Sequence, residues 1–288
     1  MANVNVVMQP LSPDLGWPSY QQNRVERWRG QQHTIQQDYI AEEVPVALVY
    51  NGEPHVVMLA TPANIEDFAL GFSITEGIIR DPSELLSVHV YNRSNGIEAR
   101  IKIPEARFEK LAGKGRNLTG RTGCGLCGAT TLQQAVRDAK TVNGDLKLTA
   151  AELYQALNEI RQLQKLNQLT GAVHAAAWIV PGHGVQYIRE DVGRHNALDK
   201  LIGLLLRLGR NPANGFLIMT SRASYELVQK AAGVGITLLA AMSAPTGLAI
   251  RLAEEAGITL IGFARDDQHV VYSHPERLNH ITYPTLIT

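Results

Sequence analysis

The two cysteines of the chain, Cys124 and Cys127, are separated by two residues within the glycine-rich run TGCGLCG. Six glycines occur in residues 111–128, and residues 110–137 contain five basic side chains and no acidic one. Glycine at this density disfavours both helix and strand, so we expect a mobile, electropositive loop. Basic neighbours increase the thiolate fraction of a cysteine, and the thiolate is the nucleophilic form. The pair therefore predicts sulfur, redox or metal chemistry.

Three familiar uses of such a motif fit this chain poorly. A structural zinc site needs four ligands, and no second C-x-x-C or nearby histidine pair supplies them, so we expect no metal site. A thioredoxin-type pair follows a strand at a helix start, whereas this pair lies in a polar loop. Gly123, Gly125 and Gly128 match G-x-G-x-x-G, but that fingerprint also requires a preceding strand. The alternative is that the two cysteines are incidental.

Polar residues follow three predicted strands in the second half of the chain, in residues 220–224, 243–247 and 263–267. The first and third of these segments contain Arg222 and Arg265, and the first two lead directly into predicted helices. Ligands of open parallel sheets bind at the carboxyl ends of the strands, and helix N-termini favour anions. We therefore expect a phosphate-bearing ligand at this edge. The alternative is that these residues are helix caps and surface arginines.

A second polar cluster lies where a predicted strand gives way to a helix at residues 194–208. Asp191, His195 and Asp199 are spaced four residues apart and could share one helix face if the helix begins early enough. One interpretation is a histidine held by the two carboxylates; the other is a capped helix start with a solvated face. His174 lies on an otherwise apolar strand and lacks the H-x-E pattern of zinc deaminases, which makes that chemistry improbable.

Periodicity predicts the elements that position these residues. Thr149 and Glu152 form a capping box that begins a helix. Beyond it, we expect strands at 173–180, 185–190, 215–221, 236–242 and 258–264, and helices at 194–208, 224–232 and 245–257. Apolar strands that alternate with helices indicate an α/β domain with a mostly parallel central sheet.

The first part of the chain shows a different pattern. Asn51-Gly52 separates two apolar runs and predicts a hairpin, followed by a helix from Pro62 and strands at 87–91 and 96–103. The expected domains are a polar, extended or loosely ordered segment at 1–40, an α+β domain at 41–110, the glycine-rich loop and linker at 111–145, and the α/β domain at 146–288.

Composition excludes several classes of protein. Of the 288 residues, 45% are hydrophobic, and 27 basic residues balance 27 acidic ones. A balanced charge provides no field for general nucleic-acid binding. The longest apolar stretch is far shorter than the roughly 20 residues that a membrane span needs, and the N-terminus lacks a signal-peptide pattern. We expect a cytoplasmic protein with neither a nucleic-acid nor a membrane partner.

Several motifs occur together in one order, and their combination resembles the FdhD family of accessory sulfurtransferases for formate dehydrogenase. The resemblance extends from about Glu42 to Pro275. The motifs are TGCGLCG at 122–128, GAVHAA at 171–176, EDVGRHNALDK at 190–200, SRASYELVQK at 221–230, SAPT at 243–246 and GFAR at 262–265.

This resemblance implies more than the residues alone do. The family takes sulfane sulfur from a cysteine desulfurase as a cysteine persulfide. It passes the sulfur to a molybdenum (or tungsten) bis-molybdopterin guanine dinucleotide cofactor, which then enters formate dehydrogenase. The second domain of the family is related in fold to cytidine deaminases. The persulfide-forming cysteine of the family matches Cys124, and its cofactor-binding stretch matches residues 263–268, although the two acidic residues there suit a pyrophosphate poorly.

The mechanism implied by the resemblance begins when the Cys124 thiolate accepts sulfur. Cys127 then assists, either as a relay or by forming a disulfide that releases the sulfur. The residues expected to bind the cofactor are Arg194, His195, Ser221, Arg222, Phe263, Ala264, Arg265, Asp266, Asp267 and Gln268. Two other functions remain open, a thiol–disulfide oxidoreductase and a chaperone that only binds the cofactor. The resemblance also implies a homodimer.

Overall fold

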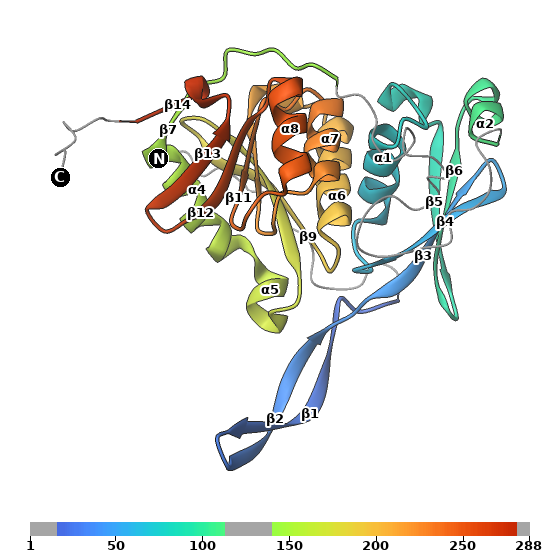
Figure 1. Ribbon diagram of the computed structural model, residues 1–288. Coiled ribbons are helices and arrows are strands. Elements are labelled where there is room, and N and C mark those ends of the chain that lie inside the picture. The colour runs from blue at the N-terminus through green and yellow to red at the C-terminus, as the bar shows by residue number, and fades with distance from the viewer. Residues whose placement is uncertain (1–15, 113–139, 281–288) are drawn as a thin grey trace.

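The computed structural model describes residues 16–112 and 140–280. Two α/β domains lie side by side, and a long hairpin projects away from both (Figure 1). The described residues contain no helix that is both long enough and apolar enough to span a bilayer.

The second domain is built on a six-stranded sheet with the order β13-β12-β11-β10-β8-β9. Its strands are β8 (His174–Val180), β9 (Gly184–Asp191), β10 (Phe216–Met219), β11 (Leu238–Ala241), β12 (Thr259–Arg265) and β13 (Gln268–Ser273). Strands β10, β11 and β12 pair in parallel, whereas β8 pairs antiparallel with β9 and β10, and β13 pairs antiparallel with β12. Strand β9 therefore runs in the same direction as β10, β11 and β12, and β8 and β13 run against them. The expectation of a mostly parallel sheet is confirmed for the centre of the sheet but not for β8 and β13, and the sheet is mixed. Short connections cause the difference, since β8–β9 and β12–β13 are hairpins rather than helical crossovers.

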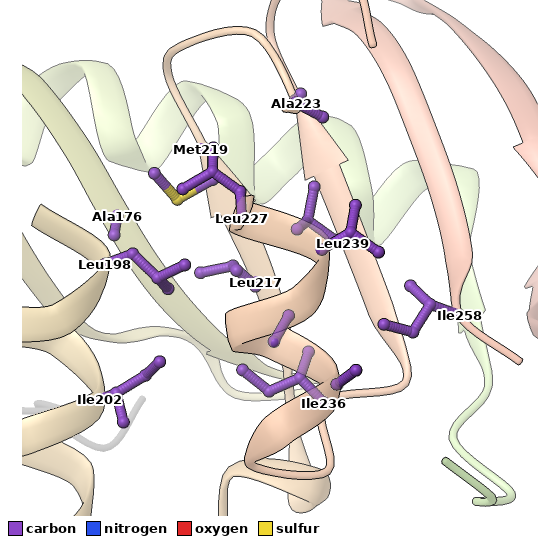
Figure 2. Packing of buried hydrophobic residues seen from close by; sticks show 14 of the residues in the cluster. Ala176, Leu198, Ile202, Leu217, Met219, Ala223, Leu227, Ile236, Leu239 and Ile258 are labelled. Atoms are coloured by element: carbon purple, nitrogen blue, oxygen red, sulfur yellow. The ribbon is translucent and has the colours of Figure 1, made fainter. Parts of the chain in front are cut away.

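Helices cover both faces of this sheet. They are α4 (Ala150–Leu163), α5 (Lys165–Thr170), α6 (Arg194–Arg207), α7 (Tyr225–Gly233) and α8 (Gly247–Ala256). Leu217 and Met219 pack in one cluster with residues of α6, α7 and α8, among them Leu198 and Leu227 (Figure 2). Phe216 and Ile218 pack with α4 on the other face. The alternation follows from the two-residue period of a strand. The expected capping box is present, with Glu152 N donating to Thr149 Oγ1 at 3.2 Å.

The first domain packs two α-helices on a four-stranded sheet with the order β4-β3-β6-β5. Its elements are β3 (Val44–Tyr50), β4 (Glu53–Ala60), α1 (Ile65–Thr75), β5 (Ser87–Arg93), β6 (Gly96–Lys102) and α2 (Glu105–Ala112). The predicted hairpin is confirmed, and Asn51 and Gly52 both have positive φ angles, as its tight turn requires. The chain also contains short 3-10 helices at Pro82–Glu84, Pro212–Asn214 and Pro275–Arg277, and β7 (Leu148–Thr149) pairs with β14 (Leu278–Asn279).

The projecting hairpin consists of β1 (Tyr20–Arg29) and β2 (Gln32–Ala41), paired along their whole length. Most of its side chains are exposed, so it adds little to either core. The sequence predicted a polar segment that is extended or loosely ordered. The described part of that segment is extended, as expected, but it is ordered into a regular two-stranded ribbon.

The domains meet where α1 packs against α6. A Cβ atom on Gly203 would lie 1.8 Å from the Asp67 carbonyl oxygen, and one on Gly71 would lie 1.8 Å from the Asp199 carbonyl oxygen. Only glycine at both positions allows the two backbones to approach this closely. The domains are therefore held at a fixed separation by direct helix contact.

Candidate ligand-binding edge

Three loops meet at the carboxyl ends of the parallel strands, as the sequence predicted. Met242 N donates to Met219 O at 2.9 Å, and Thr246 N donates to Ala223 O at 3.0 Å, which joins the first loop to the second. Phe263 N donates to Ser243 O at 3.2 Å, which joins the second loop to the third. The three segments therefore form one continuous surface.

The two helices that start at this edge differ in their first turn. Helix α7 carries Glu226 there, an acid that already balances the positive end of the helix. Helix α8 has no acid in its first turn, and its Thr246 hydroxyl caps only Ala249 N. Arg251 lies beside its start, because a Cβ on Gly247 would be 3.7 Å from Arg251 Nη1. The α8 start is therefore the better place for an anion.

The third loop is shorter than expected. Strand β12 continues to Arg265, β13 begins at Gln268, and only Asp266 and Asp267 form the turn. Asp266 lies 2.9 Å from Arg161 of α4, so an arginine offsets its charge. Ala264 is buried, whereas the other five residues of 263–268 are exposed. Most of this stretch is therefore accessible to a ligand.

The two arginines predicted at this edge, Arg222 and Arg265, are both exposed. Within the described parts of the chain, neither guanidinium forms an ion pair. Ser221 is buried and donates its hydroxyl to Arg222 O at 3.0 Å, so it shapes the loop from within. The two arginines can thus meet a phosphate group, whereas Ser221 is held in the loop.

His195 lies in the first turn of α6 and is paired with a carboxylate that its neighbours in the sequence do not reveal. Its Nε2 is 2.6 Å from Glu226 Oε2, with side-chain exposures of 14% and 11%. Ser224 Oγ is 3.5 Å from the same Nε2. Because the serine and the carboxylate both approach one nitrogen, this is not a relay of the serine-protease kind. One sequence signal could have identified this partner. Glu226 follows Ser224, at the end of a predicted strand, by two residues and lies in the first turn of a predicted helix.

The two carboxylates expected to hold His195 belong to the domain interface instead. Helix α6 begins at Arg194, so Asp191 precedes it. Asp191 lies 2.6 Å from Lys200 Nζ and accepts the Thr61 and Gly193 amides, while Asp199 binds Lys230 at 2.9 Å. Both predicted interpretations of this cluster were wrong, because the carboxylates are neither histidine partners nor solvated.

His174 and Arg194 complete the edge on the side of β8 and α6. His174 is half-buried and pairs in register with Asp191. Burial, followed by the positive charge of Arg194, lowers the pKa of His174. A neutral His174 therefore faces this part of the edge near neutral pH.

Cys124 and Cys127 lie outside the described residues, as does the rest of the glycine-rich loop. Among the residues described, no group of three or more His, Cys, Asp or Glu side chains could hold a metal ion.

These features define a class, a two-domain α/β protein with polar loops and helix starts gathered at one end of a mixed sheet. The chain belongs to the FdhD/NarQ family, whose model matches residues 41–279. It is 49% identical over 263 residues to the sulfur carrier protein FdhD of Cupriavidus necator, covering 91% of both chains. It is 50% identical over 255 residues to the protein of that name from Xanthomonas euvesicatoria, covering 88% of this chain and 91% of the relative.

A solved structure has the same fold. It is described as a putative formate dehydrogenase accessory protein from Desulfotalea psychrophila, and the TM-score is 0.72 at 24% sequence identity. The match covers 91% of this chain and 100% of that one, so both domains are included.

Proposed function

We propose that this protein is a sulfur carrier that receives persulfide sulfur from a cysteine desulfurase. It passes the sulfur to a molybdenum or tungsten bis-molybdopterin guanine dinucleotide, the cofactor of formate dehydrogenase. Family membership and the name shared by relatives at about half identity support sulfur carriage. The structural relative, described as an accessory protein of formate dehydrogenase, supports that enzyme as the client.

The observation that carries the proposal is the continuous edge formed by the three hydrogen-bonded loops. It presents exposed arginines and a helix start without an acid, which are the groups that bind phosphates of a nucleotide. The cofactor is the substrate here, and its nucleotide ends would contact Arg222, Arg265 and the start of α8. Arg194 and His195 would lie at the margin of the same surface.

In this proposal the two steps use different parts of the chain. The Cys124 thiolate attacks the persulfide of the desulfurase and takes its outer sulfur, so that the desulfurase cysteine leaves as a thiolate. Cys127 then serves as a relay or forms a disulfide with Cys124 as the sulfur leaves. The strand-end edge holds the acceptor and takes no part in the first step.

Intact-mass measurement tests the first step directly. Wild type, Cys124→Ala and Cys127→Ala are each incubated with a cysteine desulfurase and cysteine. We expect wild type and Cys127→Ala to gain one sulfur, and Cys124→Ala to gain none. A Cys124→Ala protein that is loaded as readily as wild type would show that another group carries the sulfur.

Two rival functions have separate tests. A thiol–disulfide oxidoreductase would reduce a model disulfide without any cofactor. A chaperone that only binds the cofactor would keep full activity toward formate dehydrogenase after Cys124→Ala. The cytoplasmic location, the homodimer and the kinship of the second domain with cytidine deaminases belong to the same proposal.

A further inference from the structure

Two histidines from different elements meet at the outer side of the second domain. His269 lies on β13 and His280 directly follows β14, and their Nε2 atoms are 3.0 Å apart. The two rings are inclined by only 14°, and their centroids are 5.1 Å apart, so the rings face each other through these nitrogens. Neutral imidazole nitrogen is the commonest protein ligand of metal ions. The pair therefore places two metal-binding atoms next to each other.

The fold fixes how the two histidines meet. Strand β14 pairs with β7 through Leu278 and Leu148, and β7 leads directly into α4. Both leucines are buried in one core cluster with residues of α4. Figure 1 shows β7, β13, β14 and α4 together on the side of the second domain that is away from the first. This anchor holds residue 280 beside β13.

A tyrosine of α4 orients the first of these histidines. Tyr154 Oη lies 2.8 Å from His269 Nδ1, and both residues are partly buried. A neutral imidazole carries one proton, so when Nδ1 donates it to the tyrosine oxygen, Nε2 keeps a lone pair for a metal. Metal-binding histidines are typically held by such a second contact. Burial, followed by the negative charge of Asp267, raises the pKa of Tyr154, so a carboxylate also lies near the pair and favours a cation there.

The separation of the two nitrogens suits a tetrahedral ion. Two Zn–N bonds of about 2.0–2.1 Å at the tetrahedral angle place their nitrogens about 3.3 Å apart, close to the 3.0 Å found here. We propose that His269 and His280 form a binding site for a divalent transition-metal ion such as Zn²⁺, with Tyr154 as the residue that positions His269. Water fills the other two positions, since no group of three or more His, Cys, Asp or Glu side chains comes together among the described residues.

Binding requires one proton to move. In the metal-free chain a proton lies between the two Nε2 atoms, because one imidazole donates to the other. His280 is exposed, so that proton can pass through water to its Nδ1, which leaves both Nε2 atoms free for the ion. The bound ion then joins the chain after β14 to β13 and, through Tyr154, to α4. Because only the folded chain brings the two histidines together, the ion stabilises the folded protein.

Calorimetric titration with zinc chloride tests the site. All proteins carry Cys124→Ser and Cys127→Ser, because thiolates are themselves zinc ligands. We expect this parent protein to bind one zinc ion per chain, and His269→Ala and His280→Ala each to lose that binding. Tyr154→Phe keeps both ligands but loses the orienting contact, so it should weaken zinc binding about tenfold.

His89→Ala is the matched control, because it removes an exposed histidine on β5 of the first domain, and it should leave zinc binding unchanged. Absence of zinc binding by the parent, or binding that persists in either His269→Ala or His280→Ala, would overturn the site. An equal loss in His89→Ala would overturn it as well, since zinc would then bind to scattered surface histidines. Unchanged affinity in Tyr154→Phe would remove the positioning role of that residue.

Thermal unfolding separates lost binding from lost folding. Without metal, all the variants should unfold near the temperature of the parent, since His280 is exposed and His269 is only partly buried. Added zinc should raise the midpoint of the parent and of His89→Ala and leave that of His269→Ala and His280→Ala unchanged. A rise of equal size in all of the proteins would contradict the assignment.

Discussion

Charged side chains serve different purposes in two regions of the molecule, the contact between α1 and α6 and the strand-end edge. At the contact, Asp67 accepts hydrogen bonds from both Arg189 and Arg207, at 2.8 Å each, and Asp67 and Arg189 are almost fully buried. Lys200 has a side-chain exposure of 0% and binds Asp191. At the edge, by contrast, Arg222 and Arg265 are exposed and have no carboxylate partner among the described residues.

The difference distinguishes charges that hold the fold from charges that can meet a ligand. Removing water from an ion is costly, so a buried charge must have its partner in place. Burial lowers the pKa of Lys200, and the nearby Asp191 is the main group that opposes that effect. An exposed arginine avoids this penalty and can exchange water for a phosphate. Substitutions in the first region should therefore affect stability, and those in the second should affect binding.

The largest expected effect tests the helix contact. Gly203→Ala places a methyl group against the Asp67 carbonyl, so α1 and α6 cannot dock, and we expect a loss of about 4 kcal/mol or more in unfolding free energy. Gly233→Ala is the control, because nothing lies within 4 Å of a Cβ there. Denaturant unfolding measures both, and similar midpoints would show that the contact can relax.

The next largest effect tests the buried ion pair. Lys200→Met leaves the Asp191 carboxylate without its cation, and removal of one partner from a buried pair costs about 3 kcal/mol. The double variant Asp191→Asn, Lys200→Met should recover part of that loss, since no charge is then left unpaired. Lys102→Met, at an exposed lysine, should change stability by less than about 0.5 kcal/mol. Equal losses from all three would contradict the contrast between the regions.

Arginine substitutions at the edge should have the opposite profile. Arg222→Ala or Arg265→Ala removes a charge-assisted hydrogen bond to phosphate, which weakens guanosine diphosphate by about 1.5–3 kcal/mol, or roughly tenfold to a hundredfold. Stability should stay within about 0.5 kcal/mol of wild type, and sulfur loading should be unaffected. Arg24→Ala on the projecting hairpin controls for charge loss. Unchanged affinity in both variants would exclude this edge as the nucleotide site.

The smallest effect concerns pH. Burial raises the pKa of Tyr50 above its ordinary value of 10.0, and its hydroxyl lies 2.8 Å from Ser73 Oγ. The unfolded chain therefore loses this proton first, so stability is intact below pH 10 and falls as pH rises further. Tyr50→Phe should cost about 1 kcal/mol at pH 7 and make the alkaline decline shallower. Unfolding curves at about pH 7 and pH 11 test this, and parallel declines would assign the alkaline loss elsewhere.

Local signals predicted much of the fold. The Asn51-Gly52 turn, the Thr149 capping box and the apolar strands of the second domain each depend on neighbouring residues, and each was found where expected. The projecting hairpin was missed as a regular element because it has no buried face to impose an alternating pattern. The antiparallel β13 was missed because Asp266 and Asp267 suggested a loop rather than a tight turn.

The candidate site was also predictable only where it depends on local signals. The convergence of the three loops followed from parallel neighbours β10, β11 and β12, and it was predicted. The partners of Asp191 and Asp199 were not predicted. Thr61, which binds Asp191, belongs to the other domain, and Lys230, which binds Asp199, lies on another helix. Spacing along one helix cannot reveal such long-range contacts.

The α1–α6 contact also has a consequence for synthesis on the ribosome. Helix α1 emerges well before α6, and Leu206 near the end of α6 packs against the core of the first domain. Arg189 of β9 and Arg207 of α6 both follow the first domain in the chain, so Asp67 lacks them until those elements are made, and the α1 surface around Gly71 stays open to water until α6 is complete. The first domain therefore completes its folding only after a large part of the second has been translated, although its sequence comes first.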